Sequence, residues 1–185
     1  TLNAGLTLSV CEHFINYGGF SASPTSTVLF GNAAVNQNMD GNLTVPNAFG
    51  NLSVTKTGGM VSMLQNTDAR GNLNVTNATS SFTMNAKNLK VAGNFSNVGT
   101  FIPSTGILEF NGSSPQTYSN TGLAGAEVGK VKMNHSSTGL TLLSNMTLNT
   151  SGSLDLTLGK IITNAFEVSV KNRAANAVTT GNGTS

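Results

Sequence analysis

VCEHFINYGGF, residues 10–20, returns later in the chain as VAGNFSNVGTF, residues 91–101. Four identities relate the two stretches at one constant offset: Val10 with Val91, Phe14 with Phe95, Gly18 with Gly99, and Phe20 with Phe101. Similarity at a fixed spacing is the sequence signature of a repeat architecture. The chain is therefore expected to consist of copies of one structural unit.

The similarity extends on both sides of these stretches. TSTVLFGNAAVNQ (25–37) matches STGILEFNGSSPQ (104–116), and later segments match with nearly the same offset. The further identities are Phe30 with Phe110, Gln37 with Gln116, Gly50 with Gly129, and Gly71 with Gly152. We therefore divide the chain into a first repeat at residues 1–88 and a second repeat at 89–170. Residues 171–185 are expected to start a further repeat or to form a flexible tail.

Short alternating segments such as NLSVT, ILEF, LTLL and LDLTL recur along the whole chain, separated by Gly and Asn. Alternation with period two is typical of strands that have one buried and one solvated face. Charged residues make up only 9% of the chain, while hydrophobic residues reach 38%. Because Asn, Ser, Thr and Gly favour turns over helix interiors, the composition predicts an all-β protein with a real core.

Two all-β architectures fit a repeat of about 80 residues. Tandem β-sandwich modules would need anchors such as Trp or a cysteine pair, and the chain has no Trp and one Cys. A right-handed parallel β-helix, or β-solenoid, needs turns rich in Asn and Gly and a seamless join between copies. Asn side chains could bond along its axis. The β-solenoid built from about two repeats is the favoured fold, and the tandem sandwich is the alternative.

The long run at residues 99–163 carries a family resemblance. It contains the LEFNGSSPQ box ending at Gln116, the VGKVKM strand beginning at Val128, and GSLDLTLGKI at 152–161. These features resemble repeats in very large secreted surface proteins of Bacteroidetes, which are exported by type IX secretion and include gliding-motility adhesins. The resemblance is looser over residues 1–88. It implies an extracellular scaffold or adhesive stalk and says nothing about a specific ligand.

The repeat also assigns structural roles to particular residues. Six phenylalanines are expected to point into the core: Phe14, Phe20, Phe30, Phe95, Phe101 and Phe110. Three glycine pairs are expected at equivalent turns where a Cβ would clash or a positive φ is needed: Gly18 with Gly99, Gly50 with Gly129, and Gly71 with Gly152. Gln37 and Gln116 are expected to bond backbone or a stacked neighbour at a corner.

Residues suited to catalysis are few. The seven acidic residues are not paired in the sequence, and Glu109 and Asp155 stand where the first repeat has Leu29 and Asn74. His13 and His135 have no partner at metal-ligand spacing and are expected at the surface. Cys11 is expected to be a small buried hydrophobe. We therefore expect no enzyme activity, no cofactor and no metal site.

The charge pattern and the hydropathy limit the classes of partner that the chain is expected to bind. Nine basic residues are scattered without a basic stripe, which argues against nucleic acid. No apolar run approaches the roughly 20 residues of a membrane helix, so membrane insertion is not expected. The leading hypothesis is a non-catalytic structural or adhesive module at the cell surface, whose partners are neighbouring repeats or copies of itself. The alternative is a carbohydrate-binding or carbohydrate-active β-helix that contacts surface polysaccharide.

Overall fold

The computed structural model describes residues 1–31, 35–122, 127–136 and 139–181. Every strand pairing among these residues is parallel, and none of them is helical. Accordingly, no helix in these ranges could cross a membrane. The parallel sheets stack into a β-solenoid of about 7 turns, which confirms the predicted fold class.

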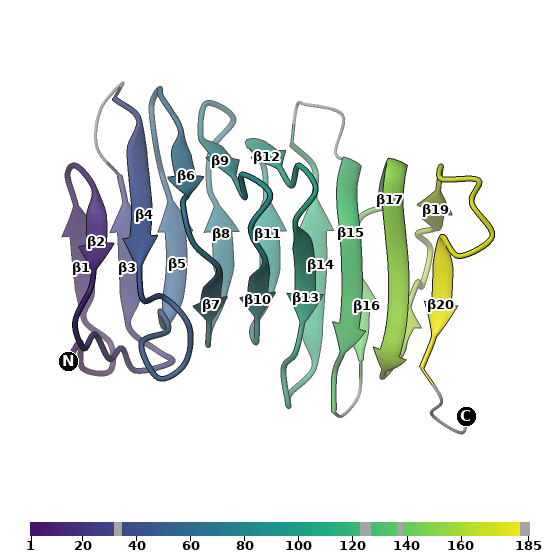
Figure 1. Cartoon of the computed structure of the whole chain (residues 1–185), viewed down its shortest axis with the longest axis horizontal. Helices are drawn as coiled ribbons and strands as arrows, with labels where there is room; N and C mark the ends of the chain where they lie inside the picture. The colour runs from purple at the N-terminus through teal and green to yellow at the C-terminus, as the bar shows by residue number, and fades with distance from the viewer. Residues whose placement is uncertain (32–34, 123–126, 137–138, 182–185) are drawn as a thin grey trace.

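Three sheets of described strands form the walls of the solenoid (Figure 1). The first sheet contains β1 (Thr7–Val10), β3 (Thr27–Phe30), β5 (Asn51–Val54), β8 (Leu73–Val75), β11 (Phe95–Asn97), β14 (Gln116–Asn120), β16 (Leu140–Leu142) and β18 (Ile161–Ile162). The second sheet contains β2 (Phe14–Asn16), β4 (Gln37–Gly41), β6 (Val61–Met63), β9 (Ser81–Thr83) and β12 (Thr100–Ile102). The third sheet contains β7 (Thr67–Ala69), β10 (Leu89–Val91), β13 (Ile107–Phe110), β15 (Glu127–Asn134), β17 (Met146–Leu158), β19 (Val168–Val170) and β20 (Val178–Thr180).

The cross-section has three faces. In Figure 1 the first sheet ascends at the back, while the second sheet and then the third descend at the front as the chain advances from N to C. This sense of rotation is right-handed, as parallel crossover connections almost always are. The long strands β15 and β17 run down both front faces, with a register shift between Val128 and Lys130. Beyond them, β19 continues the upper front face and β20 the lower.

The structural repeat is one coil of about 22 residues, with 19 to 25 residues between paired positions, which lies near the short end of the range for solenoid repeats. Thr7 pairs with Thr27 in the first sheet, and Phe14 pairs with Met39 in the second. Further along the second sheet, Phe82 pairs with Phe101. Each coil therefore contributes a strand, part of a long strand or an isolated bridge to each face. The offset that relates Val10 to Val91 is not a whole number of such coils.

The sequence similarity between the two copies nevertheless reappears in the strand pairings, turned by one face. Val10 of β1 pairs with Phe30 of β3 in the first sheet, and Val91 of β10 pairs with Phe110 of β13 in the third. In the same way β2 with β4 corresponds to β11 with β14, and β6 with β9 corresponds to β16 with β18. Strands of the first sheet thus correspond to the third, and strands of the second to the first. The second copy begins three turns and two faces after the first.

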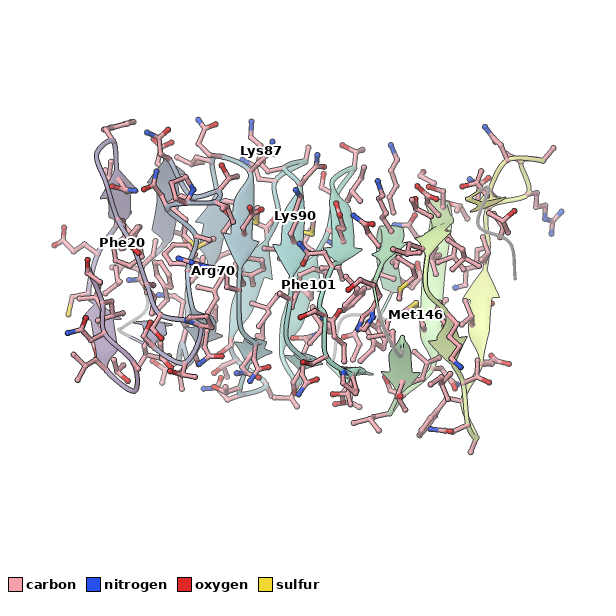
Figure 2. The ribbon with its side chains drawn as sticks, turned by 90° about the horizontal axis from the view of Figure 1, so that it is seen from below. Phe20, Arg70, Lys87, Lys90, Phe101 and Met146 are labelled. Carbon is pink, nitrogen blue, oxygen red and sulfur yellow. The ribbon has the colours of Figure 1, made fainter. Side chains whose placement is uncertain are left out.

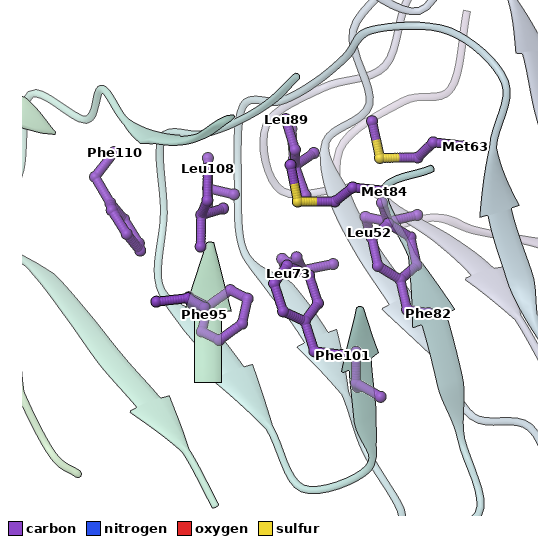
Figure 3. Packing of buried hydrophobic residues seen from close by; sticks show 14 of the residues in the cluster. Leu52, Met63, Leu73, Phe82, Met84, Leu89, Phe95, Phe101, Leu108 and Phe110 are labelled. Carbon is purple, nitrogen blue, oxygen red and sulfur yellow. The ribbon is translucent and has the colours of Figure 1, made fainter. Parts of the chain in front are cut away.

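Inward side chains form columns along the axis. The column through β3, β5, β8, β11, β14 and β16 consists of Val28, Leu52, Leu73, Phe95, Tyr118 and Leu142, all of them buried. Figure 3 shows Leu52, Leu73 and Phe95 of this column packing with Phe82, Phe101, Leu108 and Phe110. Phe95 stacks on Tyr118 with ring centroids 5.3 Å apart. Because each coil covers the apolar face of its neighbour, one core runs through the described part of the solenoid.

Candidate functional site

The six phenylalanines predicted to lie in the core differ in how deeply they are buried. Phe30, Phe95, Phe101 and Phe110 are buried. Phe14 and Phe20 point inward but are only partly buried, packed edge to face at 5.1 Å between centroids. They lie in the first described coil and pack against Phe49 of a later coil. Figure 2 shows Phe101 between the sheets, while Phe20 lies near the N-terminal end.

The two glutamines occupy matching corners on different faces. The Nε2 of Gln37 donates to Val10 O at 2.9 Å and to Glu12 O at 2.8 Å. The Nε2 of Gln116 donates to the counterparts of those carbonyls, Val91 O at 2.9 Å and Gly93 O. Both side chains are buried. Each amide therefore ties the start of one strand to the corner of the preceding coil.

Close contacts explain five of the six predicted turn glycines, and none of the six has a positive φ. A Cβ on Gly50 would lie 2.1 Å from Ser23 O, and one on Gly71 would lie 2.6 Å from Pro24 O. A Cβ on Gly99 would lie 2.3 Å from Ser80 O. Gly129 and Gly152 are tight in the same way, at 3.0 Å and 2.7 Å from a carbonyl of the coil before.

Gly18 is the exception, because nothing lies within 4 Å of its Cβ position. The prediction of a steric requirement at Gly18 is therefore wrong. The physical reason is its place in the first described coil. Its counterpart Gly99 is pressed against the coil before it, and Gly18 has no such neighbour.

Asparagine side chains link the coils along the corners. The Oδ1 of Asn51 accepts from Asn72 N, and the Oδ1 of Asn72 accepts from Asn94 N, each at 2.8 Å. Asn94 continues this ladder to Thr117 N, also at 2.8 Å. A second ladder joins Asn66 to Asn88 and Asn88 to Ile107. These bonds satisfy backbone donors at turns, so the high Asn content is structural.

Two sequence expectations about polar side chains are wrong. Cys11 is exposed, because it lies at the corner that follows β1 rather than inside the core. His135 is buried, and its Nε2 contacts Ser114 O at 2.8 Å while its Nδ1 accepts from Gly139 N at 3.3 Å. Both ring nitrogens of His135 therefore meet backbone groups inside the fold. His13 is exposed, as expected, and accepts from Asn38 N.

Lys56 is buried, which its sequence context did not indicate. Its Nζ donates to the Oε1 of Gln37 at 2.7 Å. Desolvation lowers the pKa of the Lys56 ammonium. The side-chain amide of Gln37 thus accepts a hydrogen bond from Lys56 through Oε1 and donates two hydrogen bonds to backbone carbonyls through Nε2. Lys56 and Gln37 therefore form a buried polar network, whereas the composition alone would suggest a solvated lysine at this position.

Acidic and basic residues alternate across the strands of the third sheet. On the outward side of the third sheet, adjacent strands carry Asp68, Lys90, Glu109, Lys132 and Asp155 in register, and Asp68 among them is buried and accepts from Val45 N. The signs alternate, so Lys132 stands between Glu109 and Asp155. Among the described residues no group of three His, Cys, Asp or Glu side chains could hold a metal ion. The row balances charge between neighbouring strands and gives no single-sign patch.

The two tyrosines lie in opposite environments. Tyr118 is buried, and burial raises the pKa of its phenol. Tyr17 is 74% exposed and donates to the Oδ2 of Asp40 at 3.0 Å. This bond raises the pKa of Tyr17, and the backbone N–H of Gly41 lowers the pKa of Asp40. Tyr17 is therefore the tyrosine that could meet a ligand.

The ends of the solenoid differ from its walls. At the N-terminal end the inward side chain of Leu8 is 37% exposed, and β1 and β2 each have one free edge within the described residues. At the C-terminal end Ile161, Val168 and Val170 are only partly buried, and Val178 is 48% exposed. Thr150, Val170, Lys171 and Arg173 line a pocket there. Inward apolar side chains are thus less covered in the first and last described coils than in the coils between them.

No protein-family model, curated protein or solved structure matches this chain.

Proposed function

We propose that this chain is a non-catalytic structural and adhesive module of a long extracellular surface or filament protein. The observation that carries the proposal is the continuous apolar core, which runs through the described part of a solenoid of about 7 turns. Such a module gives a protein length and stiffness, because each coil is supported by its neighbours. Repetition of the module would give many weak contacts that add up to firm attachment.

The location at the cell surface rests on a second line of support. The resemblance of residues 99–163 to repeats of type IX secreted surface proteins favours export and a role in adhesion or gliding motility. The low charge and the Asn ladders fit a scaffold whose surface chemistry is uniform. On this proposal the partners are neighbouring repeats and other copies of the chain.

The test is electron microscopy of intact cells labelled with gold-conjugated antibody against residues 1–185. We expect the label outside the cell, along extended structures. Cells that lack the parent protein should adhere less to glass or to one another. Label confined to the cell interior would contradict the proposal.

A carbohydrate-binding β-helix is the second candidate, and one observation favours it. Tyr17 presents an exposed ring beside the carboxylate of Asp40, which offers a sugar an apolar face and a hydrogen-bond acceptor side by side. The burial of Tyr118 weighs against a platform of several aromatic rings. Binding of the chain to extracted surface polysaccharide, lost in Tyr17→Ala and kept in Tyr118→Phe, would favour this candidate over simple scaffolding.

A further inference from the structure

Four side chains from successive coils lie at the corner between the second and third sheets. Tyr17 follows β2, Asp40 lies in β4, Gln65 follows β6, and Lys87 follows β9. Tyr17 donates to the Oδ2 of Asp40 at 3.0 Å, and Gly41 N donates to its Oδ1 at 2.7 Å. The pKa of Asp40 is lowered by these two donors and also by Gln65 and Lys87. The four residues, which we name the corner cluster, therefore surround an ionised carboxylate.

The strand register places the corner cluster on the outside of the solenoid. Met39 is buried and points inward, so Asp40 beside it points outward by strand alternation. Asp40 pairs there with Ile15, which is 57% exposed. Neighbouring strands lie about 4.8 Å apart, so the row from Tyr17 to Lys87 extends over roughly 14 Å. The row follows the solenoid axis and is longer than one sugar ring.

The second copy of the repeat contains the same corner without these side chains. The counterparts of the corner cluster there are Val98, Ser119, Ser144 and Phe166. The turns themselves match, since Asn85 has a φ of 48° and its counterpart Asn164 has a φ of 51°. By contrast, the amide that ties the coils together, Gln37, is identical to its counterpart Gln116. The fold therefore does not require a tyrosine, a carboxylate or an ammonium group at this corner.

The chemistry of the corner cluster suits a sugar. The ring of Tyr17 offers an apolar face, and the carboxylate of Asp40 accepts hydrogen bonds from hydroxyl groups. The ammonium of Lys87 donates, and the amide of Gln65 both donates and accepts. Because Asp40 and Lys87 carry opposite charges, the cluster has no net charge. A ligand of either sign would meet a like charge in it, whereas an uncharged ligand would not.

We propose that the corner cluster binds a neutral polysaccharide whose chain lies along the solenoid axis. A sugar ring packs on Tyr17, its hydroxyl groups donate to Asp40, and the following sugar residues contact Gln65 and Lys87. The inference rests on the second candidate function above, because it names the ligand class and the further contacts of the same tyrosine.

Affinity electrophoresis of the whole chain tests this site. The gels contain dextran, laminarin or galactomannan as neutral probes, or polygalacturonate as the acidic probe. Tyr17→Val and Asp40→Ser introduce residues that the fold already accepts at the matching corner of the second copy. Val98→Ala and Ser119→Ala alter that second corner and serve as matched controls. Thermal melting followed by circular dichroism verifies that each variant is folded.

We expect at least one neutral probe to retard the wild type and polygalacturonate to have no effect. Tyr17→Val, Asp40→Ser and Lys87→Ala should each weaken binding to the neutral probe roughly tenfold or more, because each removes a direct contact. The melting temperature of Tyr17→Val and Asp40→Ser should stay close to that of the wild type. Val98→Ala and Ser119→Ala should bind as the wild type does.

The contrary outcomes separate the site from the function. Binding to a neutral probe that survives both Tyr17→Val and Asp40→Ser would overturn the corner cluster as the site and leave carbohydrate binding in place. Retardation by polygalacturonate alone would overturn the neutral ligand class. A wild type that none of the probes retards would overturn both this inference and the second candidate function, and would leave the scaffold proposal to the cell-labelling test.

Discussion

Replacement of Gln116 by alanine probes the polar corner that both copies of the repeat contain. The substitution removes the donors to Val91 O and Gly93 O and the Oε1 that accepts from Gly112 N at 2.9 Å. Val91 O also accepts from Asn111 N, so the loss falls mainly on Gly93 O and the Gly112 N–H. Each buried group left without its partner costs about 1–3 kcal/mol. We therefore expect Gln116→Ala to lower the free energy of unfolding by about 3 kcal/mol.

Urea unfolding followed by circular dichroism measures this loss, and a melting experiment should show a fall of roughly 10 °C for a chain of this size. Gln116→Glu tests the reasoning further. It keeps the acceptor for Gly112 but places an acidic oxygen against two carbonyls, so it should be no more stable than Gln116→Ala. Glu109→Ala on the outer surface is the control and should cost less than about 1 kcal/mol, because Glu109 bonds only partly buried Asn134.

Two results would refute a structural role for the Gln116 amide. If Gln116→Ala changes stability by less than about 1 kcal/mol, the amide is not a structural tie. If the double variant with Glu109→Ala keeps its stability and loses binding to cells or polysaccharide, the corner is a ligand site.

Three further predictions follow from burial and from close contacts. Gly99→Ala should destabilise the chain by more than about 2 kcal/mol, because its Cβ would lie 2.3 Å from Ser80 O, whereas Gly18→Ala should change stability by less than about 0.5 kcal/mol; equal effects in urea unfolding would contradict this. The pKa of Lys56 is lowered from 10.5, so the unfolded chain binds more protons between the folded-state value and 10.5. The stability of wild type relative to Lys56→Met should therefore rise with pH in that window, and a fall would show the sign to be wrong. Cys11 should react fully with a maleimide in the folded protein, because it is exposed, and labelling only after denaturation would place it in the core.

The sequence alone determined the strand pattern and the spacing of the two copies, and it favoured the parallel solenoid over tandem sandwiches. Alternation along NLSVT or ILEF is a local property, since successive side chains of a strand point to opposite faces. The similarity of Val10–Phe20 to Val91–Phe101 is visible without a structure. The roles of Gln37 and Gln116 as corner amides also followed from their matching positions, because a side chain repeated at a turn has the same backbone groups within reach.

Only the tertiary structure decided the length of a coil and the face on which each copy lies. Coil length is set by how three strands and their corners close, and closure depends on contacts between residues one coil apart, such as Phe14 with Met39 or Phe82 with Phe101. Burial is decided the same way. Gly18 and Gly99 have the same local context, yet only Gly99 has a coil pressed against it. Lys56 and His135 are covered by neighbouring coils, and Cys11 is not, because strand alternation cannot say where a corner will meet solvent.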